Sequence, residues 1–301
     1  MGSLATTRSA PSLWRRLERH RVGWAFILPV FVLFAVFRIW PAINGFLLSF
    51  QDYRLAGGTT YQGLRNYRDL FDDKVFWGAL RVTLKYAVIA VPLTTVMSLA
   101  FALLINRAIR GITLYRAIYF LPYVTSLVMV SVIWSWVYRA DGGLLNGVLT
   151  GIGLEPVKWL SSKQMVIPSL AIMAAWKGVG YSMMILLAGL KAIPETLTEA
   201  SQVDGATGAQ TFWRVTLPLL RPVLFFVLVI ETIGAFQVFD TMYVMTNGGP
   251  VRASYSLVYM LYDESFKFMN FGYGAAIGMI LFLITFVVMM LQRLMFGRSD
   301  T

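Results

Sequence analysis

The chain has 301 residues, of which 57% are hydrophobic and 14% are charged, whereas a soluble domain normally carries about 25% charged residues. This deficit predicts an integral membrane protein, and the formal charge of +11, scattered between apolar stretches, indicates membrane topology, not nucleic-acid binding. The lack of cysteine excludes disulfides, thiolate nucleophiles and cysteine-ligated metals, and the single histidine, His20, argues against a catalytic triad and against histidine-rich metal sites.

Six apolar stretches are long enough to cross a bilayer core, for which about 20 residues suffice. They predict an all-α integral membrane protein with one membrane domain, residues 22–296, between a basic N-terminal segment, 1–21, and a short tail, 297–301. The first span is expected to be uncleaved and kinked by Pro29 and Pro41, because no small-residue cleavage site follows its long apolar run. The six predicted spans are 22–50, 83–105, 112–137, 166–190, 220–246 and 271–295.

The distribution of lysine and arginine predicts the orientation of these spans. With a cytoplasmic N-terminus, the cytoplasmic segments hold thirteen basic residues and the opposite segments hold nine, while the acidic counts are five and eight. Basic residues favour the cytoplasmic side, so both termini are predicted to be cytoplasmic. The polar segment 191–219 then lies in the cytoplasm, and the segments on the other side are expected to form short interfacial helices and turns.

The cytoplasmic segment contains an unusual stretch, residues 199–222, which reads EASQVDGATGAQTFWRVTLPLLRP. Pro194 suits the first turn of a helix, and Gly205 can supply the left-handed residue that ends it. A second short helix is predicted over 209–215, after which Pro218 resets the chain before span five. These signals favour a compact helical hairpin that presents aromatic side chains to a partner, over a solvated connector.

One pattern in this stretch resembles a known family. Glu199-Ala200-Ser201, three residues, Gly205, nine residues and then Val215-Thr216-Leu217-Pro218 is similar to the EAA loop of binding-protein-dependent ABC importer permeases. Ser201 and Val215 depart from the family's Ala and Ile. The segments GLRNYRDLF, YRAIYFLPYV, AGLKAIPETLTEASQVDGA and FDTMYVMTNGGP resemble the carbohydrate-uptake branch, specifically the maltose- and glycerol-phosphate-type first permease.

The resemblance implies a fold and a set of partners. The fold would be that of a type I ABC importer permease with a cytoplasmic EAA coupling helix, in a bacterial cytoplasmic membrane. The partners would be a second homologous permease, two ATPase subunits and an extracytoplasmic sugar-binding protein. The chain would be non-catalytic and bind no cofactor, leaving ATP and Mg to the ATPase subunits, in agreement with its lack of a GxxxxGK[ST] phosphate loop. The substrate could be a disaccharide, an oligosaccharide or a glycerol phosphate. The implied coupling residues are Glu199, Ala200, Ser201, Asp204, Gly205, Phe212, Leu217 and Pro218.

Ionisable residues inside a predicted span usually mark a functional site or an internal pair. Lys177 and Glu231 reach a similar depth on antiparallel spans. Three alternatives follow: an ion pair that sets helix register, hydrogen bonds to sugar hydroxyls, or isolated burial. Asp240 lies nine residues beyond Glu231, so a continuous helix would place the two on opposite faces.

A polar face near the outer end of span five adds candidates for the sugar path. Gln237, Asp240 and Thr241 share this face, and span four adds the aromatic residues Trp176 and Tyr181. Amide or carboxylate groups suit sugar hydroxyls, although aromatic residues in spans more often serve packing. The full set is Trp176, Lys177, Tyr181, Glu231, Gln237, Asp240 and Thr241. In span six, Gly274 and Gly278 predict a helix-packing face.

Two other classes of function compete with the importer subunit. An ATP-independent channel or ion-coupled carrier would explain the charges within the spans, but not the EAA-like loop. An intramembrane enzyme is disfavoured because the chain has no cysteine and no histidine within a span.

Overall fold

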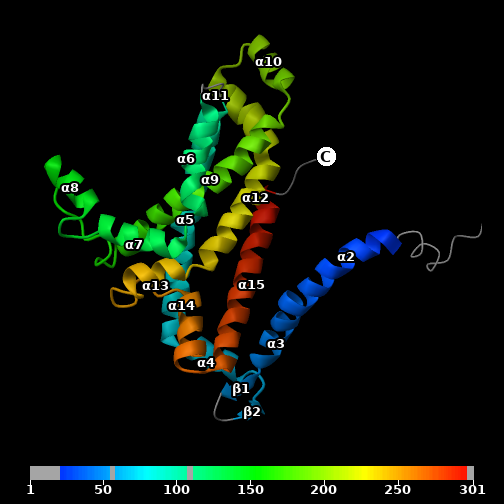
Figure 1. The fold of residues 1–301 in the computed structure, drawn as a ribbon, viewed down its shortest axis with the longest axis vertical. Coiled ribbons are helices and arrows are strands. Elements are labelled where there is room, and N and C mark those ends of the chain that lie inside the picture. The colour runs from blue at the N-terminus through cyan, green and yellow to red at the C-terminus, as the bar shows by residue number, and fades with distance from the viewer. Residues whose placement is uncertain (1–20, 55–57, 107–110, 297–301) are drawn as a thin grey trace, which may run out of the picture.

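The computed structural model describes residues 21–54, 58–106 and 111–296; His20 and the tail 297–301 lie outside this part of the chain. Its long helices run side by side in a bundle (Figure 1). Within the described part, five helices are long and apolar enough to cross a membrane, or six if one bent pair counts as a single span. The prediction of a helical membrane protein is therefore confirmed.

The centre of the bundle is the contact between α5 (Lys74–Ile105) and α9 (Val166–Lys191). Small residues permit this close packing, since Ala90 and Ala175 are both buried and Ser98 Oγ donates to the Val179 carbonyl at 3.1 Å. Helix α6 (Ile112–Val124) also approaches α9 closely, because a methyl group at Gly180 would lie 2.0 Å from the Tyr119 carbonyl oxygen. Span four matches its prediction, whereas span two begins earlier than predicted, after the Asp73 cap.

Span one is helical throughout but irregular at one place. It consists of α2 (Arg21–Phe34), a π-helical turn (Ala35–Ile39) and α3 (Trp40–Leu48). Pro41 follows the π turn, which relieves the clash between the proline ring and the carbonyl four residues earlier. Helix α2 stands apart from the bundle (Figure 1), and no residue of its most apolar stretch is buried.

Span three is bent, so the prediction of one helix over 112–137 was wrong. Helix α6 (Ile112–Val124) meets α7 (Leu127–Val137) at 96°, across two extended residues. The apolar run continues on both sides of the bend and is interrupted there only by Thr125 and Ser126, with Pro122 in the last turn of α6. The end of α6 receives hydrogen bonds from Lys177 of α9, which hydrophobic length cannot reveal.

Span five is broken as well, which corrects the predicted helix over 220–246. Helix α12 (Leu217–Phe236) ends, and after Gln237, Val238 and Phe239 the short helix α13 (Asp240–Thr246) begins. Phe239 has φ −140° and ψ −61°, outside the helical region. Helix α13 packs against α7, so the outer halves of the two interrupted spans lie side by side (Figure 1).

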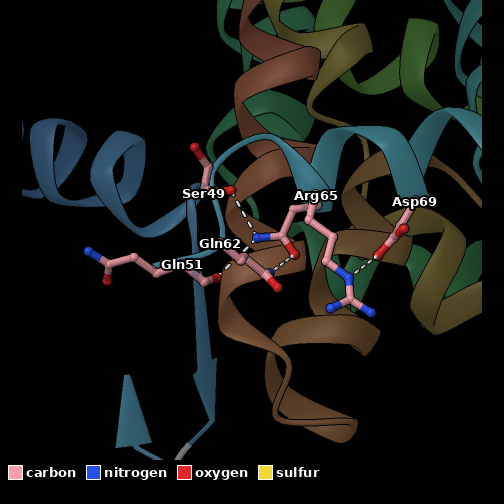
Figure 2. A network of polar contacts seen from close by, with 6 residues as sticks. Ser49, Gln51, Gln62, Arg65 and Asp69 are labelled. Atoms are coloured by element: carbon pink, nitrogen blue, oxygen red, sulfur yellow. Dashed lines mark hydrogen bonds and ion pairs between the residues drawn. The ribbon is translucent and has the colours of Figure 1, made fainter. Parts of the chain in front are cut away.

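The end of the bundle opposite α10 (Glu195–Val203) carries short elements, as predicted, together with an unpredicted β-hairpin (Figure 1). Strands β1 (Gln51–Arg54) and β2 (Gly58–Tyr61) pair antiparallel, with Gln51 opposite Tyr61. Helix α4 (Arg65–Asp72) is joined to this hairpin by Asn66, whose amide donates to the carbonyls of Ser49 and Gln51 at 2.9 and 3.0 Å (Figure 2). Helix α14 (Leu257–Tyr262) and a π-helical turn (Asp263–Lys267) also lie near this end, whereas α8 (Leu144–Gly151) lies to one side of the bundle, beyond α7 (Figure 1).

Span six forms α15 (Phe271–Phe296), in agreement with its prediction. A methyl group at Gly274 would lie 2.1 Å from Ser265 Oγ, and one at Gly278 would lie 3.2 Å from the Leu261 side chain. The two glycines therefore form a helix-packing face, as predicted. This face packs against α14 and the π-helical turn.

Candidate functional site

The polar segment between spans four and five folds into a helical hairpin at one end of the molecule (Figure 1). Helix α10 (Glu195–Val203) ends at Asp204, and Gly205 follows with φ +80°, the left-handed conformation predicted for it. Helix α11 (Gly208–Thr211) then begins with a capping box formed by Thr207 and Gln210. Local structure therefore closes both helix ends that meet in the hairpin: Gly205 ends α10, and the capping box begins α11.

A hydroxyl pair joins the two arms of the hairpin. Ser201 Oγ lies 2.9 Å from Thr211 Oγ1, within hydrogen-bond distance. Ser201 is a departure from the EAA pattern, and its hydroxyl forms this link. Around it the hairpin surface is exposed, including Glu199, Ala200 and Asp204, and the apolar side chains of Val203 and Trp213 protrude.

The second arm of the hairpin differs from its prediction. Helix α11 continues through a π-helical turn (Phe212–Thr216) directly into α12, so 209–215 is not a separate helix and Pro218 does not reset the chain. This π turn accommodates Pro218 in the same way as the π turn Ala35–Ile39 accommodates Pro41. In each case the carbonyl four residues before the proline lies within the π turn, which relieves its clash with the proline ring. The result is one continuous helix from Gly208 to Phe236, with Leu217 half-buried along it.

A second region of interest is a cavity of about 320 Å³ within the bundle. It lies where the interruptions of spans three and five face α5 and α9, so side chains from four spans line it. Five of the seven predicted substrate-path residues are in its wall: Lys177, Glu231, Gln237, Asp240 and Thr241. No group of three or more metal-binding side chains occurs in the described parts of the chain.

Lys177 does not pair with Glu231, although both line the cavity. Its Nζ donates instead to the carbonyls of Pro122, Tyr123 and Thr125, at 3.2, 2.9 and 3.0 Å. These carbonyls lie at the C-terminal end of α6, where the bend removes their helical partners. A cation also complements the negative end of the helix dipole. Of the three alternatives, the ion pair is therefore not the one that the structure contains, because the end of the broken helix takes the ammonium.

Glu231 has a partner on α9 of its own. Ser182 Oγ donates to Glu231 Oε1 in a short hydrogen bond. Among the described residues, neither Glu231 nor Asp240 forms an ion pair with a lysine or arginine. The interruption at 237–239 turns Asp240 back toward the cavity, so the prediction that it and Glu231 occupy opposite faces was wrong.

Two predicted residues lie next to the cavity, outside its wall. Trp176 packs on Trp134 with ring centres 5.4 Å apart, and Tyr181 stacks on Tyr123 at 4.6 Å. Sequence reasoning also missed three polar lining residues: Tyr86, Thr94 and Tyr123. A recognisable signal existed for part of this set, because Tyr86, Ala90 and Thr94 recur at intervals of four along one face of α5.

The fold and its two sites define the chain as a many-span membrane protein with an exposed helical hairpin at one end and an internal polar cavity. Residues 95–299 match the family described as "binding-protein-dependent transport system inner membrane component". The chain belongs to this family, as the EAA-like pattern predicted. Its members named below are permease proteins, which are transporter subunits and not enzymes.

Similar proteins span nearly the whole chain. The trehalose/maltose transport system permease protein MalF of Thermococcus litoralis is 34% identical over 89% of this chain and 91% of its own length. The lactose transport system permease protein LacF of Rhizobium radiobacter is 34% identical, with coverages of 96% and 97%. A crystal structure of a bacterial ABC transporter involved in import of the acidic polysaccharide alginate matches with a TM-score of 0.82 and 24% identity, covering 97% of this chain and all of that one. This likeness confirms the type I importer permease fold.

Proposed function

We propose that this chain is the permease subunit of an ATP-driven carbohydrate importer, that it forms half of the sugar path, and that it couples to a cytoplasmic ATPase through the hairpin at 191–219. The relatives named for trehalose/maltose and for lactose support a sugar substrate. A solved relative of this fold is named for a complex with a periplasmic protein, which supports an extracytoplasmic binding protein as a partner.

One observation carries the coupling proposal: the hairpin and the cavity share a helix. The continuous helix Gly208–Phe236 has 29 residues, which corresponds to about 43 Å at 1.5 Å per residue. Its first turn closes the docking hairpin, and its last two turns carry Glu231 into the cavity wall. A displacement of the hairpin would therefore move the cavity wall as a rigid body, which is how alternating access operates in domain-rocking transporters.

The proposed partners follow from what the chain exposes. The cavity is open, which favours a second permease as its other wall. The unburied first span offers apolar surface to that permease or to lipid. Val203 and Trp213 each expose an apolar side chain on the hairpin, which suits binding to a groove of an ATPase subunit. Both termini are proposed to lie in the cytoplasm, on the same side as the hairpin.

Reconstitution tests this proposal against the ATP-independent carrier. Liposomes that contain this chain alone should show no flux of labelled lactose or maltose and no ATP hydrolysis. Co-expression with the second permease and the ATPase pair should yield hydrolysis, and sugar with its binding protein should raise the rate, since the ligand shifts the complex toward a closed ATPase state. Flux through the chain alone, above that of empty liposomes, would favour the carrier.

A further inference from the structure

The charged groups of the cavity have unequal freedom to meet a ligand. Among the described residues that line it, Lys177 is the one cation, and Glu231 and Asp240 are the two acids. An ammonium group has three N–H donors and no acceptor. All three donors of Lys177 are directed to carbonyl oxygens of the α6 end, at 2.9 to 3.2 Å. The single cation of this wall is therefore committed to the protein backbone.

The acidic side of the cavity is less committed. Glu231 accepts one hydrogen bond, from Ser182 to its Oε1 atom, and it has a second oxygen. Asp240 is exposed at the start of α13 and forms no ion pair within the described chain. A carboxylate can accept about four hydrogen bonds, so both groups retain acceptor capacity. A carboxyl group carries no positive charge in either protonation state, so neither residue offers an anion a cationic partner.

The remaining polar lining favours hydroxyl ligands. Gln237 is exposed and offers an amide, with two donors and an acceptor, and the hydroxyl of Thr241 lies in the same wall. The ring of Tyr86 adds an apolar face with a polar tip. A sugar hydroxyl both donates and accepts hydrogen bonds, so it can use each of these groups. A carboxylate, sulfonate or phosphate only accepts, and it would face two carboxyl groups without a free ammonium.

We propose that this cavity takes an uncharged saccharide and disfavours an anionic one. The inference rests on the proposed function, since it specifies the substrate class of the same path. The acids act by accepting hydrogen bonds from sugar hydroxyls, and the ammonium of Lys177 acts on the protein instead of the ligand. The discrimination arises because like charges at close range in a partly desolvated site repel strongly. It is a property of this wall, separate from the choice made by the binding protein.

Binding to the assembled transporter, without its binding protein, isolates the cavity. The complex is placed in nanodiscs, and the affinities of lactose and of digalacturonate, a neutral and an anionic disaccharide, are compared by saturation-transfer NMR titration. We expect digalacturonate to bind at least tenfold more weakly than lactose at low salt. Asp240→Asn and Glu231→Gln should each narrow this ratio at least threefold, because each removes an acid. Asp141→Asn, an exposed acid outside the cavity, should leave the ratio unchanged.

The outcomes separate the inference from the proposed function. Equal or tighter binding of digalacturonate in the unaltered complex would overturn the inference and leave the importer assignment intact. So would a ratio that neither cavity variant changes, because the discrimination would then come from elsewhere. Failure of the unaltered complex to bind either sugar would contradict the assignment of this cavity to the sugar path. ATP hydrolysis by each variant complex shows that it has assembled.

Discussion

Removal of the Lys177 ammonium tests the contact that holds the bend of span three. In Lys177→Met the Pro122 carbonyl keeps a partner, because the Thr125 hydroxyl donates to it at 2.6 Å. The carbonyls of Tyr123 and Thr125 lose their donor. Both hydrogen bonds are exposed to solvent, so each contributes the net value of an ordinary hydrogen bond, about 0.5–1.5 kcal/mol. The expected destabilisation is therefore about 2 kcal/mol.

A loss of this size should be visible in thermal unfolding of the assembled complex. At about 2–4 °C per kcal/mol, Lys177→Met should lower the midpoint by about 4–8 °C. Lys177→Arg keeps a cation with N–H donors and should lose less, and Lys163→Met, at an exposed lysine, controls for loss of charge. Because the chain lacks cysteine, spin labels at Leu114 on α6 and Trp136 on α7, both exposed, can report the bend. An unchanged midpoint with an unchanged label distance would refute the role of Lys177.

Three further predictions concern separate parts of the fold. Gly205→Pro should abolish sugar uptake while the protein still inserts into the membrane. Proline cannot adopt φ +80°, and it lacks the backbone amide that closes α10. Uptake at the unaltered rate would contradict the proposed coupling role of the hairpin. Gly180→Ala should destabilise the complex in thermal unfolding, since its methyl group would lie 2.0 Å from a backbone oxygen of α6, whereas Gly178→Ala meets its nearest atom at an ordinary 3.5 Å; equal midpoints would show that α6 can shift away. Burial, followed by neighbouring carboxylates, raises the pKa of Glu264 above 4.5. The folded state therefore binds this proton more tightly than the unfolded state, so Glu264→Gln should stabilise the complex most near pH 8 and least near pH 5, and a benefit that grows as the pH falls would oppose this reasoning.

The parts of the structure that follow from the sequence are those determined by local chemistry. Spans four and six form where apolar length predicts them. Gly205 adopts its predicted conformation because the turn itself needs a residue with positive φ, and this need does not depend on what the hairpin packs against. The family pattern also covers this hairpin, so family and local chemistry give the same prediction there. What remains implied is its docking to an ATPase.

The interruptions of spans three and five could not be predicted from apolar length. The apolar run of span three continues on both sides of the bend, and the donors that replace its missing hydrogen bonds come from Lys177, more than fifty residues away. The ion-pair alternative for Lys177 and Glu231 rests only on the similar depths of the two charges. The carbonyls at the end of α6 are a competing partner for Lys177, and they become available only because the helix bends there.

The same interruptions explain why a cavity with polar walls exists in this bundle. A continuous helix forms all its own backbone hydrogen bonds. If span five were such a helix, the face that lines the cavity would carry Glu231, and Asp240 would lie on the opposite face. The break at 237–239 places both acids in one wall, and the bend of span three places backbone carbonyls within reach of Lys177. Helix α12 ends at this break and begins at the hairpin, so a rotation of the hairpin would be transmitted to the residues that line the cavity. A single helix of this chain thus links the proposed docking surface to the proposed sugar path.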